Sequence, residues 1–301
     1  MNVHLVDIII PELNREVVHK IKALEINGRA RALQDLVNLA EKHPQDYRKL
    51  LITLELVASN YRVLNKTKVR PGIGKGLEGI FEMKGGQARL FFFYDEGTTD
   101  IIVCTNMYWK AHSSPKLQNK AFQIAAEMRK IYFQVMNGKY IRKELVMSSI
   151  DKENLPAIVG EALEDVEDTD VLLDKLKSHH TDLNLSSDPE FIAEYLKTMF
   201  VEDIWRVMDE QGISRAELAR RLGKSRQYVG RVLHESANFT LESIAELACA
   251  LGMQVVLRLH DPSEKVTFQP NPMAKKPPEH EADKEQEAQS PISPPKRSKA
   301  V

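Results

Sequence analysis

The sequence predicts two folded parts, an α+β domain followed by an all-α domain. Strand-like and helix-like patterns mix over residues 1–140, whereas apolar residues recur at helical spacing throughout 198–252. The length of 301 residues suits two domains of ordinary size. We divide the chain into a first domain, an acidic linker, a second domain and a tail, at residues 1–140, 141–197, 198–262 and 263–301.

The first domain is expected to contain an N-terminal strand, helices, an antiparallel sheet and a C-terminal helix. Val3–Ile10 is a short apolar run that ends before Pro11 and predicts the strand. Apolar residues at helical spacing predict helices over Leu13 to Leu24, Leu33 to Ala40, Tyr47 to Val57 and, after the sheet, Leu117 to Ile131.

Three strand-like runs follow the glycine-rich basic loop Arg70–Gly76. They cover Leu77–Met83, Arg89–Tyr94 and Asp100–Thr105, and short turns join them. Such connections are typical of hairpins, so the sequence predicts an antiparallel meander. Phe91–Phe93 are expected to fill the core on both faces of this sheet.

The net charge of −1 conceals an uneven distribution of charge along the chain. Residues 1–146 carry 23 basic and 15 acidic side chains, whereas residues 147–190 carry 3 and 12. Such asymmetry hints at nucleic-acid binding or at self-masking. No apolar run approaches the roughly 18 residues needed to span a bilayer, and two distant cysteines suit a reducing compartment. We expect a soluble cytoplasmic protein with no membrane partner, no metal, no cofactor and a disordered tail.

Part of the second domain carries the pattern of two short helices around a tight turn. Ser214 has the character of an N-cap, with Glu217 completing a capping box. Gly223 permits the turn, and Ser225 caps the next helix. Over roughly residues 198–252 the sequence resembles the helix-turn-helix of the Cro/repressor (XRE) family. The resemblance implies five short helices and a recognition helix that enters the major groove of DNA.

The same resemblance indicates which residues contact DNA. Arg226 and Gln227 are the best candidates to read base edges. Phosphate contacts are expected from Ser214, Arg215, Lys224 and Arg231. Ser225 and Tyr228 complete the outward surface. Met253–His260 is predicted to be a strand. One module reads only half a site, so the resemblance implies a homodimer that pairs there or through the last helices.

Four motifs of the first domain form a second recognisable set. They are Arg70–Gly76, Gly79–Glu82, Ala88–Tyr94 and Asn106–Lys116. Over roughly residues 3–137 they resemble the RelE/ParE superfamily, and most closely its HigB-like, phage-related toxins. The resemblance implies an endoribonuclease that cuts mRNA on the ribosome.

Cleavage of this type needs no metal, because the 2′-OH of the RNA attacks the adjacent phosphate and leaves a cyclic phosphate. The protein must neutralise charge on the phosphate and move protons, which suits Arg, Lys and His. The catalytic candidates are Arg70, Lys75, Arg89, Lys110, His112 and Lys116, and the candidates for stacking on bases are Tyr94, Tyr108 and Trp109. For any one of these Lys or Arg residues alone, a solvated surface is the better interpretation, so the prediction depends on the cluster as a whole.

In HigB-like systems a toxin gene commonly precedes an XRE-type antitoxin gene, and this chain has the same order. Met147–Ile150 also resembles a fresh start of translation. We therefore interpret the chain as a toxin–antitoxin pair in one polypeptide, whether a natural fusion or two joined chains. The acidic segment Asp151–Glu190 would lie over the basic mouth of the first domain and compete with RNA, helped by its tether. The DNA-binding module would repress its own operon.

Three alternatives stay open. The chain can be a transcription regulator whose toxin-like domain is degenerate. The first domain can instead be ParE-like and inhibit gyrase without cutting RNA. The acidic segment can be a solvated linker.

Overall fold

The structure is a computed structural model that describes residues 1–11, 17–98, 100–110, 115–141, 155–183, 185–234 and 239–259. The predicted disordered tail, His112 and the Met147–Ile150 motif lie outside these residues. Within them, no helix has the length and apolar character needed to cross a membrane.

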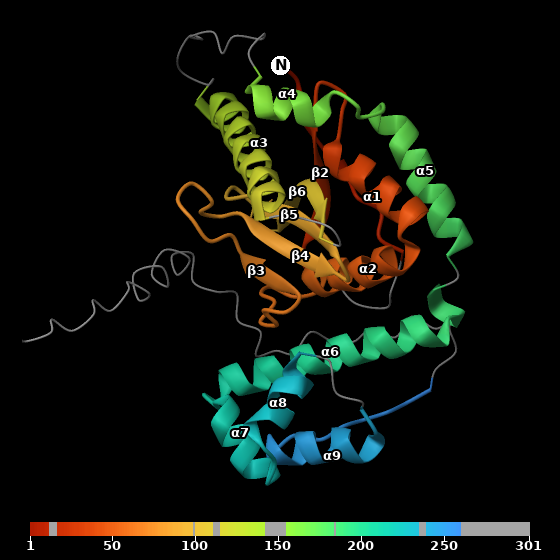
Figure 1. Ribbon diagram of the computed structural model, residues 1–301, viewed down its shortest axis with the longest axis vertical. Helices are drawn as coiled ribbons and strands as arrows, with labels where there is room; N and C mark the ends of the chain where they lie inside the picture. The colour runs from red at the N-terminus through yellow and green to blue at the C-terminus, as the bar shows by residue number, and fades with distance from the viewer. Residues whose placement is uncertain are drawn as a thin grey trace, which may run out of the picture. The chain divides into compact units, whose positions relative to one another are not determined.

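A six-stranded mixed sheet forms the centre of the first domain (Figure 1). Its strands are β1 (Val3–Asp7), β2 (Lys20–Ile26), β3 (Val69–Pro71), β4 (Phe81–Gly85), β5 (Ala88–Tyr94) and β6 (Ile101–Trp109). They lie in the order β1-β2-β6-β5-β4-β3. Strand β2 runs parallel to β6, and the other neighbouring pairs are antiparallel. The predicted meander is therefore confirmed as β4, β5 and β6.

Three helices cover the two faces of this sheet: α1 (Arg31–Lys42), α2 (Pro44–Ala58) and α3 (Pro115–Ile141). Helix α3 lies on one face and helices α1 and α2 on the other (Figure 1). On the α3 face, Phe91 packs against Phe122 with ring centroids 4.5 Å apart. Phe92 points the other way and stacks with Phe81. Both phenylalanines are fully buried, so the expectation that this run fills the core on both faces is confirmed.

The helix predicted over Leu13 to Leu24 is wrong where the structure describes it. Lys20–Ile26 is strand β2, which pairs with β1 on one side and with β6 on the other. The spacing of the apolar residues fits a helix, but four residues of the strand are buried, at positions 21, 23, 24 and 26. Pairing on both sides satisfies the backbone and buries these side chains, and it outweighs the local preference.

The acidic segment is folded where the structure describes it. It forms α4 (Ala157–Leu163), α5 (Thr169–Asp182), a 3₁₀ turn (Leu185–Ser187) and the start of α6 (Pro189–Glu210). Val159, Leu172 and Leu176 are buried in the same hydrophobic cluster as the sheet. We call residues 155–183 and 185–188 the strap, because they pack along the first domain through apolar contacts rather than forming a solvated linker.

Helix α6 is shared by two hydrophobic clusters and runs across the expected boundary at residue 197. Met199 belongs to the cluster of the first domain, whereas Ile204 belongs to the second. The second cluster also contains residues of α7 (Arg215–Leu222), α8 (Arg226–Leu233) and α9 (Leu241–Ala250). The described part of this region thus holds four helices where the resemblance implied five.

The strand predicted over Met253–His260 is wrong for residues 253–259, which belong to no helix or strand. Their side chains are exposed, with Leu257 at 68% and Val256 at 72%. A strand needs a neighbour to accept and donate its backbone hydrogen bonds, and alternating apolar residues alone do not supply one.

Candidate nucleic-acid interfaces

The turn between α7 and α8 is built by the three residues that the sequence indicated. The Oγ of Ser214 accepts a hydrogen bond from the backbone N–H of Glu217 at 3.1 Å. Gly223 ends α7 in the left-handed region, with φ 62°. The Oγ of Ser225 then accepts the N–H of Tyr228 at 3.1 Å. Two capped helices joined by one left-handed glycine are thus confirmed.

The Glu217 side chain differs from the predicted capping box, because it turns toward two arginines. Its carboxylate pairs with Arg220 at 2.7 Å and with Arg221 at 2.8 Å. Hydrogen bonds from Arg220, and then from Arg221, lower the pKa of Glu217 to about 2. The carboxylate stays ionised and keeps both arginines close to the start of the tight turn.

The polar face of α8 is open to solvent, as expected for a recognition helix. Arg226, Gln227 and Arg231 are exposed, as are Ser225 and Lys224 before them. The opposite side of the helix is buried through Val229, Val232 and Leu233. This division leaves the long polar side chains on the outer face, where base edges and phosphates are read.

The three remaining candidates for DNA contact are arranged around this face. Ser214 and Arg215 are exposed at the start of α7. The guanidinium of Arg215 lies over the Trp205 ring, 5.0 Å from its centroid. The ammonium of Lys224 lies 5.9 Å from the ring centroid of Tyr228. Contact with a ring restrains a long cationic side chain. The ammonium of Lys224 also pairs with Glu246 at 3.4 Å, an exposed contact that DNA phosphate would have to replace.

The first domain gathers two of the predicted catalytic residues on one face of the sheet. Arg70 on β3 stands opposite Glu82 on β4. Lys84 on β4 stands opposite Arg89 on β5. Glu82 and Lys84 are two residues apart along one strand, so their side chains share a face. This face is that of Phe91, which stands opposite Glu82.

Glu82 and Lys84, which were not among the predicted catalytic residues, also belong to this cluster. Burial first, and then the charge of Arg70, lower the pKa of Lys84 to about 8. A lysine whose pKa lies near neutrality can hold or give up a proton under physiological conditions. Two features of the sequence could have indicated that Lys84 lies opposite Arg89. Apolar and charged residues alternate along residues 81–84, and the glycines at 85 and 86 form the turn into β5.

The other catalytic candidates are not all joined to this cluster. Lys110 follows β6, and its charge helps to lower the pKa of Lys84, so it lies near the cluster. Lys75 is exposed in the glycine-rich loop, and Lys116 is exposed at the start of α3. His112 lies outside the described residues.

The three aromatic candidates for base stacking have different surroundings. Tyr94 is half-buried and packs against the rings of His19, Phe81 and Phe92. Burial raises its pKa to about 12. The Trp109 ring is stacked on another ring, with centroids 3.8 Å apart. The stacking partner is His43, whose ring covers one face of the Trp109 indole. Tyr108 is half-buried.

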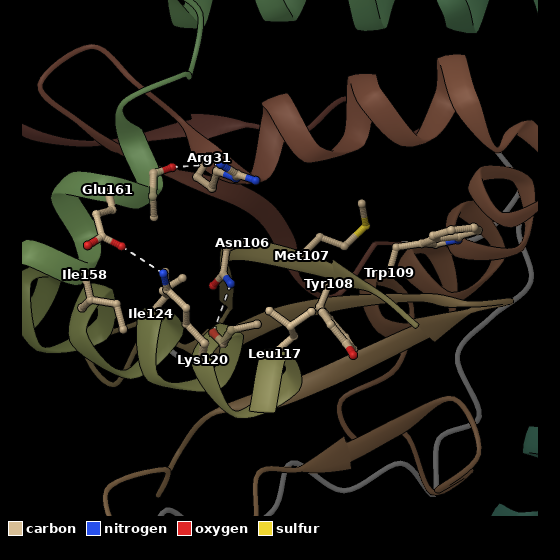
Figure 2. Close-up of a pocket in the computed structure, with 12 residues that line it drawn as sticks. Arg31, Asn106, Met107, Tyr108, Trp109, Leu117, Lys120, Ile124, Ile158 and Glu161 are labelled. Carbon is tan, nitrogen blue, oxygen red and sulfur yellow. Dashed lines mark hydrogen bonds and ion pairs between the residues drawn. The ribbon is translucent and has the colours of Figure 1, made fainter. Parts of the chain in front are cut away.

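A cavity of about 540 Å³ lies between β6, α3, α1 and α4 (Figure 2). Tyr108, Trp109 and Met107 line it from β6, and Ile158 lines it from the strap. Lys120 on α3 closes the rim by pairing with a strap glutamate at 2.9 Å, as Figure 2 shows. The cavity is therefore bounded partly by the strap.

The strap contacts differ from the masking that the charge pattern predicted. Arg29 donates to the carbonyl oxygens of residues 163 and 164 at 2.8 and 3.1 Å, and Arg31 donates to Ala162 at 3.0 Å. These bonds satisfy the last carbonyl groups of α4. Arg70 and Arg89 instead contact groups within the sheet. Two acidic strap residues do pair with cations of the first domain, Glu161 with Lys120 and Asp188 with Arg48, but neither cation is one of the predicted catalytic residues.

Among the described residues, no group of three or more His, Cys, Asp or Glu side chains is arranged to hold a metal ion. Both cysteines are free, Cys104 buried and Cys249 exposed.

Comparison with known proteins identifies one region of the chain. Residues 205–256 match the helix-turn-helix family, of XRE type. No curated protein and no solved structure matches the chain. The match covers α7, α8 and α9 together with the end of α6. It supports a DNA-binding, regulatory role for this part of the protein.

Proposed function

We propose that the protein is a sequence-specific DNA-binding repressor that acts on its own operon, with α8 as the recognition helix. The observation that carries this proposal is the capped turn between α7 and α8 with its exposed polar face. Arg226 and Gln227 read base edges from the start of α8. Ser214, Arg215, Lys224 and Arg231 contact phosphates and set the register of the helix on the duplex, with Ser225 and Tyr228 beside them.

One helix-turn-helix unit reads one half-site, so the proposal includes a homodimer on a two-fold operator. Sedimentation of the full chain, free and with DNA, measures the number of copies bound. Two copies per operator are expected. A single copy on a tight site would contradict the dimer.

The DNA-binding proposal is tested with the full chain and a DNA fragment from upstream of its own coding region. Fluorescence anisotropy compares this fragment with an unrelated fragment of the same length at fixed salt. The double variant Arg226→Ala, Gln227→Ala should lose most of the preference for the upstream fragment. Lys177→Ala removes a charge from α5 and should leave that preference unchanged. A wild-type protein without any preference would contradict operator binding.

We propose a second function for the first domain, metal-independent endonucleolytic cleavage of mRNA on the ribosome. What supports it is the convergence of Arg70, Lys84 and Arg89 on one face of the sheet, with Lys110 near them. Fixed cations stabilise the negative charge that develops when a 2′-OH attacks the adjacent phosphate. A lysine with a pKa of about 8 can also transfer a proton at the leaving oxygen. Together with the DNA-binding part, this describes a toxin–antitoxin protein in one chain.

This second function is tested by adding the full chain to translating ribosomes and mapping the mRNA ends. Cleavage with a 2′,3′-cyclic phosphate product is expected, and Arg89→Ala should abolish it. Lys130→Ala, which removes an exposed charge on α3, should not. If the mRNA stays intact with wild type and with both variants, the result would favour a regulator whose first domain has lost the activity. Intact mRNA with inhibited gyrase would favour the ParE-like alternative.

A further inference from the structure

Glu82 is an ionisable residue that the sheet buries completely. Its side chain has 0% exposure, and its Oε1 contacts Arg70 Nε directly. Lys84 Nζ and Arg89 Nε each lie 3.9 Å from the same oxygen. Its Oε2 accepts no hydrogen bond within the part of the chain that the structure describes. A buried carboxylate is costly unless cations surround it, so these three side chains are the reason that Glu82 is tolerated.

The strand register fixes where these four side chains start. Arg70 is opposite Glu82, and Lys84 is opposite Arg89. The turn between β4 and β5 packs closely against α2, because a Cβ at Gly85 would lie 2.3 Å from the backbone of Leu50. The backbone therefore sets the position of each side chain, and the Glu82 carboxylate directs the Arg70 guanidinium. The charged ends of Lys84 and Arg89 donate to backbone carbonyls beside the carboxylate, within 3.9 Å of it.

Three cations around one anion leave an excess of positive charge. The distances of 3.9 Å are longer than a hydrogen bond, so Lys84 and Arg89 do not donate to Glu82 in this arrangement. Arg70 exposes 42% of its side chain, against 19% for Lys84 and 12% for Arg89. An anion would thus meet Arg70 first and then the two less exposed cations.

Glu82 also controls the charge of Lys84. Burial and the Arg70 charge lower the pKa of this amine to about 8, and the Glu82 charge acts in the opposite direction. Without the carboxylate, the amine would lose its proton at a lower pH. The carboxylate therefore keeps Lys84 cationic near neutral pH.

We propose that Glu82 is a positioning residue that gathers Arg70, Lys84 and Arg89 into one binding site for a phosphodiester of single-stranded RNA. This rests on the endonuclease function proposed above and adds to it a buried anion, Glu82, that organises the three cations. Arg70 admits the phosphate, and Lys84 and Arg89 contact it from within the sheet. Glu82 does not touch the RNA, since it has no exposed surface.

The first test measures the charge of Lys84 without any RNA. The full chain is labelled with a trace of acetic anhydride across pH 6 to 10, and the reactivity of Lys84 is followed by peptide mass spectrometry. Glu82→Gln should lower the pH midpoint of labelling by about one unit or more, because a charge within about 4–6 Å shifts a pKa by one to three units. Arg70→Gln should raise the midpoint, since it removes a repelling cation.

Glu96→Gln is the matched control for this experiment. Glu96 pairs with Arg129 at 2.5 Å and is largely exposed, so the same change of charge there should leave the Lys84 midpoint where it is. If Glu82→Gln unfolds the protein, the upward shift with Arg70→Gln remains the test, because Arg70 is partly exposed. Unchanged midpoints in the folded variants would overturn the positioning role.

The second test measures binding to a 12-nucleotide 2′-O-methyl RNA, which cannot be cleaved by 2′-OH attack. Wild-type affinity should fall as the pH rises through about 8, the pKa of Lys84. In Glu82→Gln this fall should occur at lower pH, whereas a purely structural role would weaken binding without moving the midpoint. If wild-type protein binds this RNA but leaves ordinary mRNA intact, the endonuclease function is contradicted, whereas the phosphate-binding site remains supported. Wild-type protein that does not bind the RNA would overturn the site itself.

Discussion

The Glu202 carboxylate on helix α6 accepts the backbone N–H of Asn65, with its Oε2 3.0 Å from that nitrogen. Its Oε1 accepts the N–H of Leu64 at 2.6 Å. Glu202 lies between Met199, which is buried with the first domain, and Ile204, which is buried with the second. One carboxylate therefore ties the helix shared by both clusters to the loop that enters β3.

Glu202 makes the stability of the protein depend on pH. Burial raises the pKa of Glu202 to about 7, above the ordinary value of 4.5. Between these values the folded protein holds a proton that the unfolded chain has lost. The stabilisation is therefore complete below about pH 4.5 and is lost as the pH rises through about 7. Glu202→Gln should gain stability relative to wild type over this range, by about 3 kcal/mol at most.

Urea unfolding of both proteins at pH 5, 6, 7 and 8 measures this difference. Glu210→Gln is the control, because Glu210 lies on the same helix and is exposed. The free energy of unfolding of this control, plotted against pH, should run parallel to that of wild type. Parallel curves for Glu202→Gln as well would show that Glu202 does not carry the pH dependence.

The elements that the sequence predicted correctly are those whose signals are local. Helix α1 ends at His43-Pro44, where a proline must stop the preceding helix. The turn between α7 and α8 depends on Ser214, Gly223 and Ser225, each of which acts on neighbours a few residues away. Caps and turns of this kind can be read from one sequence, because their partners lie beside them in the chain.

The features that the sequence did not predict depend on contacts between distant residues. Strand β2 exists because β1 and β6 flank it. Glu82 and Lys84 gain their roles from Arg70 and Arg89 on neighbouring strands. The strap lies on the helices because Leu172 and its neighbours are buried there, and the excess of acidic residues concealed that apolar pattern.

Two glycines should respond in opposite ways to the same substitution. A Cβ at Gly85 would lie 2.3 Å from the backbone of Leu50 on α2, so strand and helix must separate. Gly85→Ala should therefore destabilise the protein by about 3 kcal/mol or more. At Gly160 in α4 nothing lies within 4 Å of the new methyl group. Gly160→Ala should stabilise the helix by about 0.5–1 kcal/mol, as alanine does within helices.

Thermal unfolding of these two variants and wild type under one set of conditions measures both effects. Equal midpoints for Gly85→Ala and wild type would mean that β4 can move away from α2 without loss. A lower midpoint for Gly160→Ala would mean that α4 meets a partner at that position.

Arg31 should contribute far more to stability than an exposed cation of the same region. It pairs with Asp35 at 2.9 Å, and that carboxyl is buried, which raises its pKa. It also holds the carbonyl of Ala162 in the strap. Arg31→Gln should cost about 2–3 kcal/mol, since the buried carboxyl loses its cation. Lys120→Gln breaks only an exposed pair with Glu161 and should cost less than about 1 kcal/mol.

Urea unfolding gives the two free energies, and hydrogen exchange shows where the loss falls. Amides of α4 should exchange faster in Arg31→Gln, because its last carbonyl groups lose a donor. Equal free energies for the two variants would contradict the importance of the buried pair.

Gln227 and Lys224 should affect DNA binding in different ways. Gln227 is exposed near the start of α8, where a side chain reaches base edges, and Lys224 lies in the turn before it. Gln227→Ala should reduce the preference for the operator over unrelated DNA by about 1–3 kcal/mol and leave binding to unrelated DNA unchanged. Lys224→Ala should weaken both, because a phosphate contact carries no sequence information.

Titrations at several salt concentrations separate the two roles. The slope of log affinity against log salt should become shallower by about one for Lys224→Ala and stay constant for Gln227→Ala. Lys130→Ala controls for the loss of one positive charge elsewhere in the chain. If Gln227→Ala instead changed the salt slope and kept the sequence preference, Gln227 would be a phosphate contact, and base reading would have to come from Arg226 or Arg231.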